Sequence, residues 1–388
     1  MQPMSRYQLT DAAFQFLSQL KSAVTRDAFL HKCAAQGAVS VEEAARMWEA
    51  LEGAGLLRET AVSAQPNDYA ARFGAWRSHR GMLADTARVV AFASAIKARV
   101  DAECSVIDVG AGSGILSLLA ARAGAKHVYA LEATPIIHDA RAVASVNGLA
   151  DRISFVEGDA SRFTSPAPVD LVMGEFIGMY LFEEWRHYEA FACVRNANLK
   201  PGGQVIPAKA CLYLSLLDDS RLYVERGPGY WQRPVWGFDF RLVHERQLDR
   251  TRRIIVQAAK HTLLEPVKIF ELNCLRDESR SFFFETTFEK TFTHSATCHG
   301  FIGYLDLELA PGVMLDASPF SMDTSWHQSY FPIEQIHIEA GDTALVEVKS
   351  VPDEFTGSPV LNICIALRRG KALITTQERL YTLDDTQG

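Results

Sequence analysis

The sequence has little that would indicate a disulfide-bonded, zinc-stabilised or membrane-spanning protein. Its seven cysteines are an odd number and form no C-x-x-C pair, so neither a disulfide framework nor a structural zinc site is predicted, and we expect no metal. The first twenty residues lack the apolar stretch of a signal peptide, and no charge-free apolar run reaches the roughly 18 residues that a spanning helix needs. These absences favour a reducing, cytoplasmic location.

The chain also has fewer basic than acidic residues. The chain carries 39 lysine and arginine residues against 47 aspartate and glutamate residues, for a formal net charge of -8. Nucleic acid and anionic membranes are therefore poor partners, and a cationic partner is favoured. Hydrophobic residues make up 48% and charged residues 22% of the chain, as is ordinary in folded globular proteins.

The length of 388 residues predicts two or three domains, the first of them helical. Residues 1–64 contain three predicted short helices and a possible hairpin, and the third helix starts at a capping box formed by Ser40 and Glu43. This pattern is typical of a winged-helix-like module. Its six basic and seven acidic residues favour packing or peptide docking over DNA binding.

Residues 65–207 alternate between predicted helices and strands. One long helix is predicted across residues 82–91. Strands are predicted at 106–109, 127–131, 153–156 and 170–173, and helices at 115–123, 136–147 and 182–199. The alternation predicts an α/β, Rossmann-like domain with a mostly parallel sheet.

Residues 208–388 change to a period of two, with Leu305, Leu307 and Leu309 as an example. This pattern predicts a predominantly antiparallel β domain, either a barrel or a sandwich. Residues 223–239 are rich in aromatic residues and proline, and we interpret them as an insertion that reaches a neighbouring subunit.

A glycine-rich turn follows the first predicted strand of the α/β domain. The strand that contains Asp108 leads into Gly110, Gly112 and Gly114, and glycine is required where a ligand lies against the backbone. Glu132 ends the next strand, where a carboxylate accepts hydrogen bonds from both ribose hydroxyls. Because the spacing does not suit a pyrophosphate and no P-loop lysine is present, S-adenosylmethionine fits better than a dinucleotide. The alternative is a loop that packs tightly against its own helix.

Two further residues are candidates for contacts to this cofactor. Its amino-acid end carries a carboxylate, and Arg88, on the helix before the sheet, can supply a bidentate pair. A solvated helix arginine is the alternative for Arg88. Asp159 follows the third strand and is a candidate adenine contact, with an ordinary loop cap as an equal alternative.

Two glutamates follow the fourth strand of the parallel sheet. Ligands bind beyond the carboxyl ends of such strands, so we expect Glu175 at the active edge, and Gly178 lets the chain fold back and bring Glu184 to the same pocket. Two carboxylates that face one cavity repel each other unless a cation lies between them, which predicts a guanidinium substrate. The glutamates would accept its N–H groups and align one nitrogen for in-line methyl transfer. A helix-start charge or a surface loop residue is the alternative for Glu175.

Residues 67–385 resemble the protein arginine methyltransferase family. The resemblance rests on HRGMLADTAR at 79–88, VIDVGAGSGILSLLAARAGAKHVYALE, LKPGGQVIPAKACLYL and the double-glutamate loop GEFIGMYLFEE. It implies a class I methyltransferase domain that binds S-adenosylmethionine, a β-barrel substrate domain, and a homodimer formed through an arm at about 214–239. It also implies roles for the matching residues: substrate binding by Glu175, Glu184, Tyr180 and Trp326, and cofactor binding by Arg88 and Glu132.

The chain departs from the family pattern near the substrate site. The usual Thr-His-Trp loop is Thr-Ser-Trp at 324–326, so Ser325 replaces the histidine while Asp85, its usual partner, remains. Ile177 and Arg186 stand where the family has methionines, which leaves the degree and symmetry of methylation open. We therefore expect methylation of arginine in a protein or peptide. Methylation of free L-arginine or another small guanidino compound is the rival hypothesis, and a non-catalytic regulatory or binding protein is a third.

Overall fold

The computed structural model describes most of the chain from residue 73 onward. The described residues are 73–178, 180–256, 265–321, 324–354 and 357–381, together with Ser40, Glu42, Ala45, Arg46, Trp48, Glu49 and Glu52, and for Glu183 the backbone alone is described. Two compact units are present, Met1–Ala71 with Glu354–Gly357 and Arg72–Asp353 with Ser358–Gly388. The predicted N-terminal module lies almost wholly outside the described residues, although its six described positions from 42 to 52 are helical.

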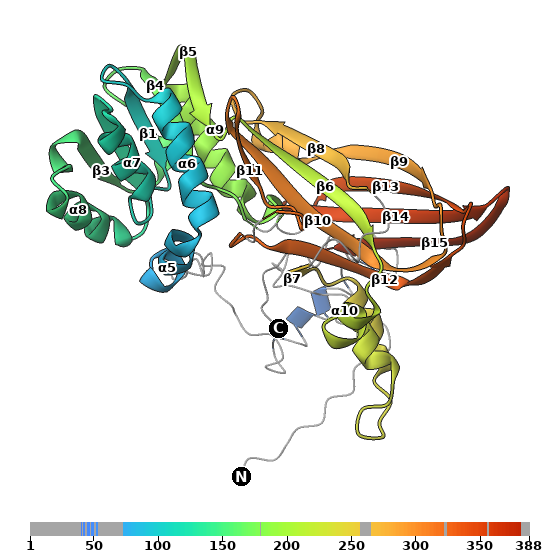
Figure 1. Ribbon diagram of the computed structural model, residues 1–388. Coiled ribbons are helices and arrows are strands. Elements are labelled where there is room, and N and C mark those ends of the chain that lie inside the picture. Colours follow the sequence, from blue (N-terminus) through green and yellow to red (C-terminus); the bar gives the residue numbers. More distant parts are fainter. Residues whose placement is uncertain are drawn as a thin grey trace. The chain divides into compact units, whose positions relative to one another are not determined.

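The second unit begins with two helices and a five-stranded parallel sheet (Figure 1). The elements are α5 (Trp76–Ala84), α6 (Thr86–Arg99), β1 (Ser105–Val109), α7 (Ile115–Ala123), β2 (His127–Glu132), α8 (Ile136–Val146), β3 (Ile153–Glu157), β4 (Val169–Gly174), the 3-10 helix η3 (Phe182–Glu184), α9 (Trp185–Asn198) and β5 (Leu199–Ile206). The strand order is β3-β2-β1-β4-β5, and every pair is parallel. This confirms the predicted α/β architecture. Within the described ranges, no helix has both the length and the apolar character needed to cross a bilayer.

The three central strands of this sheet, β1, β2 and β4, are largely buried on both faces. Val106, Ile107, Val128 and Val172 have no exposed surface. Parallel strands covered by helices have such continuous apolar runs, and burial of each large side chain contributes about 1.5–3 kcal/mol. The strand ends are thereby fixed, and they carry the candidate site.

The single helix predicted across residues 82–91 is wrong, because the chain forms two helices there. Asp85 lies between them with φ -72° and ψ 88°, and its Oδ1 accepts a hydrogen bond of 3.0 Å from the amide of Arg88. An aspartate at this position caps α6, since its short carboxylate satisfies an amide that the helix leaves free. The break places Arg88 in the first turn of α6.

The antiparallel part of the second unit contains two sheets. One has the order β7-β12-β10-β6-β8, with β11 paired to β10, and the other has the order β15-β14-β13-β9. Their strands are β6 (Lys209–Leu217), β7 (Arg252–Ile254), β8 (Val267–Asn273), β9 (Glu285–Thr291), β10 (Ala296–Ala310), β11 (Val313–Asp316), β12 (Gln328–Ile338), β13 (Thr343–Pro352), β14 (Pro359–Arg369) and β15 (Ala372–Tyr381). Leu305, Leu307 and Leu309 are buried along β10, which confirms the predicted period of two. Closure into a barrel stays a prediction.

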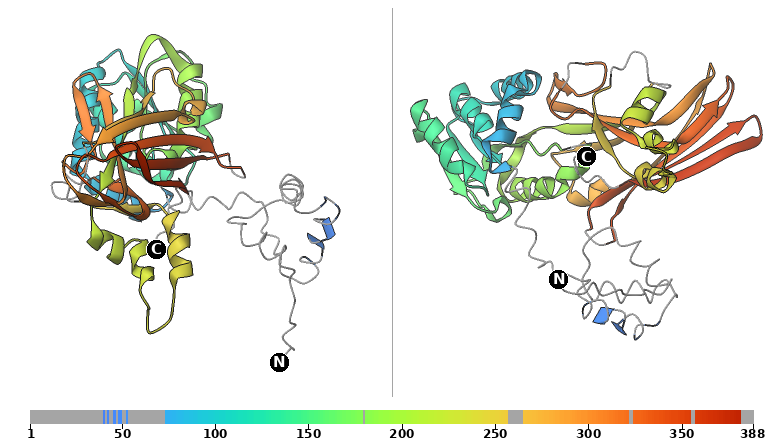
Figure 2. Two further views of the ribbon diagram at one scale, coloured as in Figure 1. Left: turned by 90° about the vertical axis from the view of Figure 1, so that its right-hand side faces the viewer. Right: turned by 90° about the horizontal axis from the view of Figure 1, so that it is seen from below.

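The segment 218–248, which we call the arm, projects from the antiparallel part (Figures 1 and 2). It contains α10 (Ser220–Glu225), η4 (Pro228–Gln232) and α11 (Arg241–Leu248). We predicted an arm from about residue 214, but residues up to Leu217 belong to β6, and Leu214 has no exposed surface. Alternation along a strand does not by itself show where the strand leaves its sheet.

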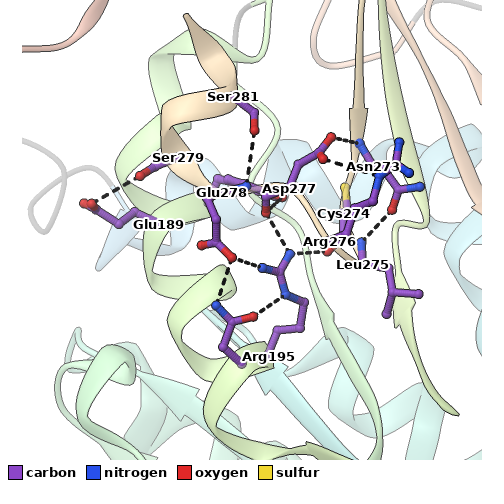
Figure 3. A network of polar contacts seen from close by, with 12 residues as sticks. Glu189, Arg195, Asn273, Cys274, Leu275, Arg276, Asp277, Glu278, Ser279 and Ser281 are labelled. Atoms are coloured by element: carbon purple, nitrogen blue, oxygen red, sulfur yellow. Dashed lines mark hydrogen bonds and ion pairs between the residues drawn. The ribbon is translucent and has the colours of Figure 1, made fainter. Parts of the chain in front are cut away.

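Arg195 joins the parallel and antiparallel parts of the second unit (Figure 3). It lies on α9 with 2% of its side chain exposed, and its Nη2 pairs with Oε1 of Glu278 at 2.7 Å. Its Nη1 donates to the carbonyl oxygens of Cys274 at 2.7 Å and Asp277 at 2.8 Å, in the turn after β8. A buried guanidinium with its partners on another element holds α9, and with it the chain next to Glu184, against the antiparallel part.

Candidate active site

The glycine turn between β1 and α7 is shaped by backbone conformation and by a buried histidine. Gly110, Gly112 and Gly114 have φ angles of 72°, 52° and 79°, in the left-handed region that favours glycine. A Cβ atom on Gly112 would lie 2.6 Å from Cε1 of His79, so a larger residue there would force the histidine ring to move. His79 is 5% exposed, and its Nε2 lies 2.6 Å from the carbonyl oxygen of Phe73. Our sequence analysis did not assign His79 to the site.

Glu132 lies at the end of β2, next to this turn, and is 8% exposed. Its Oε2 accepts a hydrogen bond of 2.8 Å from the amide of Gly112, and its Oε1 accepts one of 2.8 Å from the amide of Thr134. These bonds fix the carboxylate while each oxygen keeps a second lone pair. The arrangement suits a carboxylate that accepts hydrogen bonds from two ribose hydroxyls.

Asp108 on β1 is almost completely buried, with 1% exposure. Its Oδ2 accepts a hydrogen bond of 2.6 Å from the hydroxyl of Ser117, whereas no described residue donates to its buried Oδ1. Burial raises the pKa of Asp108 to about 7, the hydrogen bonds from Ser117 oppose this rise, and the charge of Glu132 adds to it. A buried carboxylate oxygen without a donor beside the glycine turn fits a cationic group of a ligand, such as an ammonium.

Arg88 is buried rather than solvated, so the alternative of a surface helix arginine is wrong. Its Nη2 pairs with Oε2 of Glu175 at 2.5 Å, and its Nη1 donates to the carbonyl oxygen of Met82 at 2.9 Å. Its Nε is buried and donates to no described residue. A guanidinium has five N–H groups, so these two bonds leave donors for a ligand carboxylate.

Glu175 and Glu184 are brought together by the fold. Glu175 directly follows β4, which ends at Gly174, and Glu184 is the last residue of η3. Glu175 accepts a hydrogen bond of 2.7 Å from the amide of Ile177 in addition to its pair with Arg88, and its side chain is 11% exposed. Burial raises the pKa of Glu175, Arg88 and the Ile177 amide oppose this rise, and the charge of Glu184 adds to it. The two carboxyl groups are therefore close enough to interact electrostatically. The alternative of a surface loop residue is wrong for Glu175.

Glu184 is 7% exposed and lies immediately before α9. Its Oε2 forms an ion-pair contact with Nδ1 of His187, one helical turn further on. That oxygen accepts no well-aligned hydrogen bond from the residues that the structure describes. His187 was missed by the sequence analysis, although its spacing of three residues from Glu184 on a helix was an available signal.

Tyr180 packs in the core, and its predicted contact with the substrate stays a prediction. It is 2% exposed, and its hydroxyl donates to the carbonyl oxygen of Tyr213 at 2.9 Å. Its ring lies 5.3 Å from the ring of Phe331, centroid to centroid. Tyr180 and Leu181 have positive φ angles of 54° and 68°, which cost about 1–3 kcal/mol each for residues other than glycine. The buried ring thus anchors a strained turn that returns the chain from Glu175 toward Glu184.

Trp326 lies in the segment where the resemblance placed a histidine, and it is 6% exposed. Oδ2 of Asp85 accepts a hydrogen bond of 2.8 Å from the amide of Ser325, while its Oδ1 caps α6. Asp85 therefore ties this loop to the helix of Arg88 through the backbone.

Asp159, a predicted cofactor contact, and Arg186, a departure from the family pattern, both lie on the surface. Asp159 is exposed, and its Oδ1 accepts hydrogen bonds from the amide of Ser161 at 3.0 Å and its hydroxyl at 2.7 Å, which lower its pKa. The loop-cap alternative is thus observed, and the adenine contact stays a prediction. Arg186 is exposed, with its Cζ 5.6 Å from the ring centroid of Trp185.

Two family models match the chain. One is described as the arginine methyltransferase oligomerization subdomain and matches residues 208–365, and the other is described as ribosomal protein L11 methyltransferase and matches residues 90–184. The second match begins within α6 and includes β1, β2, β3 and β4 but not β5, and the first covers most of the antiparallel part.

Relatives and solved structures span both parts. Protein arginine N-methyltransferase 1 of Schizosaccharomyces pombe is 30% identical over 69% of this chain and 79% of its own length, and that of Saccharomyces cerevisiae is 30% identical over 76% and 86%. The Trypanosoma brucei PRMT1 enzyme-prozyme heterotetrameric complex with AdoHcy aligns with a TM-score of 0.73 at 22% identity, covering 80% of this chain and 99% of that chain. Protein arginine methyltransferase 10 of Arabidopsis thaliana aligns with a TM-score of 0.70 at 21% identity, covering 81% and 99%. The two structural alignments show that the fold is shared.

Proposed function

Because the chain belongs to the protein arginine N-methyltransferase family, we propose that it transfers a methyl group from S-adenosylmethionine to a guanidino nitrogen of arginine in a protein or peptide. One observation carries the proposal: the buried carboxyl groups of Glu175 and Glu184 interact, and Oε2 of Glu184 has no well-aligned donor from the described residues. A planar cation between them would relieve their repulsion and supply the missing donors.

The cofactor would be held by residues around the glycine turn. Glu132 would accept from the ribose hydroxyls, Oδ1 of Asp108 would face the ammonium, and Arg88 would pair with the carboxylate through its remaining N–H groups. Asp159 is proposed beside the adenine. When bound, S-adenosylmethionine supplies a methyl carbon that its sulfonium makes electrophilic.

The two glutamates would act differently on the guanidinium. Glu175 is fixed by Arg88 and by the amide of Ile177, so it orients the substrate without moving. Glu184 has an oxygen available for an N–H of the attacking nitrogen. The two carboxylates draw the positive charge of the guanidinium toward the N–H groups that they bind and away from the attacking nitrogen. The lone pair of this nitrogen is then a better nucleophile. We propose Trp326 as a wall of the substrate site.

The arm is the proposed contact between two copies of the chain in a homodimer. Its side chains of Trp236, Phe238 and Leu242 are 94%, 69% and 69% exposed, and burial of such apolar surface favours association. The oligomerization-subdomain match, residues 208–365, includes the arm. We also propose a domain boundary near residue 207, since β5 ends at Ile206 and β6 begins at Lys209. The free thiols of the described cysteines support a cytoplasmic location.

The test offers isotope-labelled S-adenosylmethionine to the full-length protein with arginine-rich peptides and, separately, with free L-arginine. Methylated arginine in the peptides, identified by mass spectrometry, is the expected result. Labelling of free arginine alone would replace the proposal with the small-molecule alternative. If calorimetry detects no binding of the cofactor, the non-catalytic alternative is favoured instead.

A further inference from the structure

His187 links a buried carboxylate of the site to the surface. Its Nδ1 contacts Oε2 of Glu184, whose side chain is 9% exposed, whereas 37% of the His187 side chain is exposed. The imidazole therefore has one nitrogen at the glutamate and a ring that reaches solvent. The first turn of α9 fixes this geometry, since residues three apart lie on the same face of a helix.

Glu184 contacts a side chain that can pass a proton on, whereas Glu175 contacts an arginine and a backbone amide, which cannot. Glu175 has a hydrogen bond or ion pair at both oxygens, from the amide of Ile177 and from Arg88, and neither group accepts a proton. Oε2 of Glu184 has the imidazole as its ion-pair partner. Arg186, the residue before His187 on α9, is exposed.

We propose that His187 carries the proton of methyl transfer from Glu184 to solvent, an inference that rests on the function proposed above. Methylation forms an N–C bond and breaks the bond from the methyl carbon to sulfur, whose electron pair stays on sulfur. The guanidinium is cationic before and after the reaction, so one proton is released from the attacking nitrogen in each turnover. That proton passes to Oε2 of Glu184 and then to Nδ1 of a neutral His187 that carries its hydrogen on Nε2. The imidazolium releases its Nε2 proton to water, and proton exchange with water returns the ring to the Nε2–H tautomer before the next turnover. His187 is a positioning and relay residue that acts through Glu184.

This assignment makes the rate depend on the protonation state of one imidazole. An imidazolium cannot accept the proton from Glu184, and it also neutralises the carboxylate that the substrate needs. We therefore expect kcat to fall as the pH is lowered and the imidazole becomes protonated.

The test compares His187→Asn and His187→Ala with the wild type in steady-state methylation of an arginine peptide from pH 5.5 to 9. Asparagine places an amide near the position of Nδ1 and keeps a polar side chain beside Glu184, but it does not titrate. We expect His187→Asn to keep KM within about twofold, to lose at least about tenfold in kcat at pH 7 and to lose the acid limb of the kcat profile. In His187→Ala, added imidazole should restore part of kcat.

His337→Ala is the matched control, because His337 is exposed on β12, with its Nδ1 3.2 Å from the hydroxyl of Thr297. It should keep the wild-type profile and show no response to imidazole. The assignment is overturned if both His187 variants keep the wild-type pH profile, or if they lose activity equally at every pH without rescue by imidazole. A wild-type protein that methylates no guanidino compound would overturn the proposed function itself, which the wild-type reaction shows before any variant is compared.

Discussion

Binding of S-adenosylmethionine should expel a proton from Asp108 when the pH is below neutrality. Oδ1 of Asp108 is buried without a donor from the described residues, and burial raises its pKa to about 7, so the free protein holds a proton there in mildly acidic solution. An ammonium placed beside this oxygen favours the carboxylate and lowers its pKa. The same proton therefore leaves when the cofactor binds.

The size of the effect follows from the pKa of Asp108. With a value of about 7, the acid is protonated in roughly 0.9 of the molecules at pH 6 and in roughly 0.1 at pH 8. Proton release should thus fall from about 0.9 to about 0.1 per cofactor bound. Removing that proton at pH 6 costs about 1.4 kcal/mol, so the dissociation constant should be about tenfold larger at pH 6 than at pH 8.

Calorimetry of cofactor binding in buffers with different ionisation enthalpies measures this proton release. Asp108→Asn keeps the shape of the side chain and should abolish the change between pH 6 and pH 8. The same substitution should make the free energy of unfolding of the ligand-free protein less dependent on pH. A carboxyl group whose pKa is raised on folding stabilises the protein when protonated, and this contribution is lost as the pH rises from about 4 to about 7. A proton release that does not vary with pH, or that persists in Asp108→Asn, would refute the reasoning.

Glu184→Gln should keep the cofactor dissociation constant within about twofold but lower kcat by roughly 100-fold or more, as measured by calorimetry and steady-state kinetics, because Glu184 acts on the substrate. Arg88→Ala leaves Glu175 buried without its cation, so we expect the free energy of unfolding in urea to fall by about 3–5 kcal/mol and cofactor binding to weaken. Asp85→Ala removes the cap of α6 and the acceptor for the amide of Ser325. Stability should fall by about 0.5–2 kcal/mol, and hydrogen exchange at Ser325 should become faster.

An exposed ion pair provides the control for the Arg88 variant. Arg221 pairs with Glu225 on α10 at 3.0 Å, with 82% and 57% of their side chains exposed, so Arg221→Ala should change stability by less than about 1 kcal/mol. Equal destabilisation by the two arginine substitutions would contradict the buried pair. A Glu184→Gln variant that loses cofactor affinity as strongly as kcat would contradict the role of Glu184 on the substrate. Unchanged hydrogen exchange at Ser325 in Asp85→Ala would contradict the role of Asp85.

Much of the parallel-sheet domain was predictable because its signals are local. Continuous apolar runs such as the one in β1, followed by the glycines from Gly110 to Gly114, predict a strand, a turn and a helix from adjacent residues. The break at Asp85 was missed because apolar residues continue at helical spacing on both sides of it, and the capping bond outweighs that pattern.

The partners of the site residues were less predictable. Arg88 and Glu175 are 87 residues apart and meet because α6 and the end of β4 pack together. The family resemblance implied a substrate contact for Tyr180, and gave no indication that its hydroxyl bonds to β6, an element of the antiparallel part. Neither contact has a signal in the neighbouring sequence.

The amino-acid sequence by itself determined which residue types are present at the ends of consecutive strands, and the chemistry of glycine and carboxylate limited what those ends could bind. Only the tertiary structure decided that Glu175 is held by Arg88, that Glu184 contacts His187, and that Asp85 binds the backbone of Ser325. The physical reason is that the type of a local element follows from a few neighbouring residues. The charge state and orientation of a buried side chain depend instead on every group that packing brings around it.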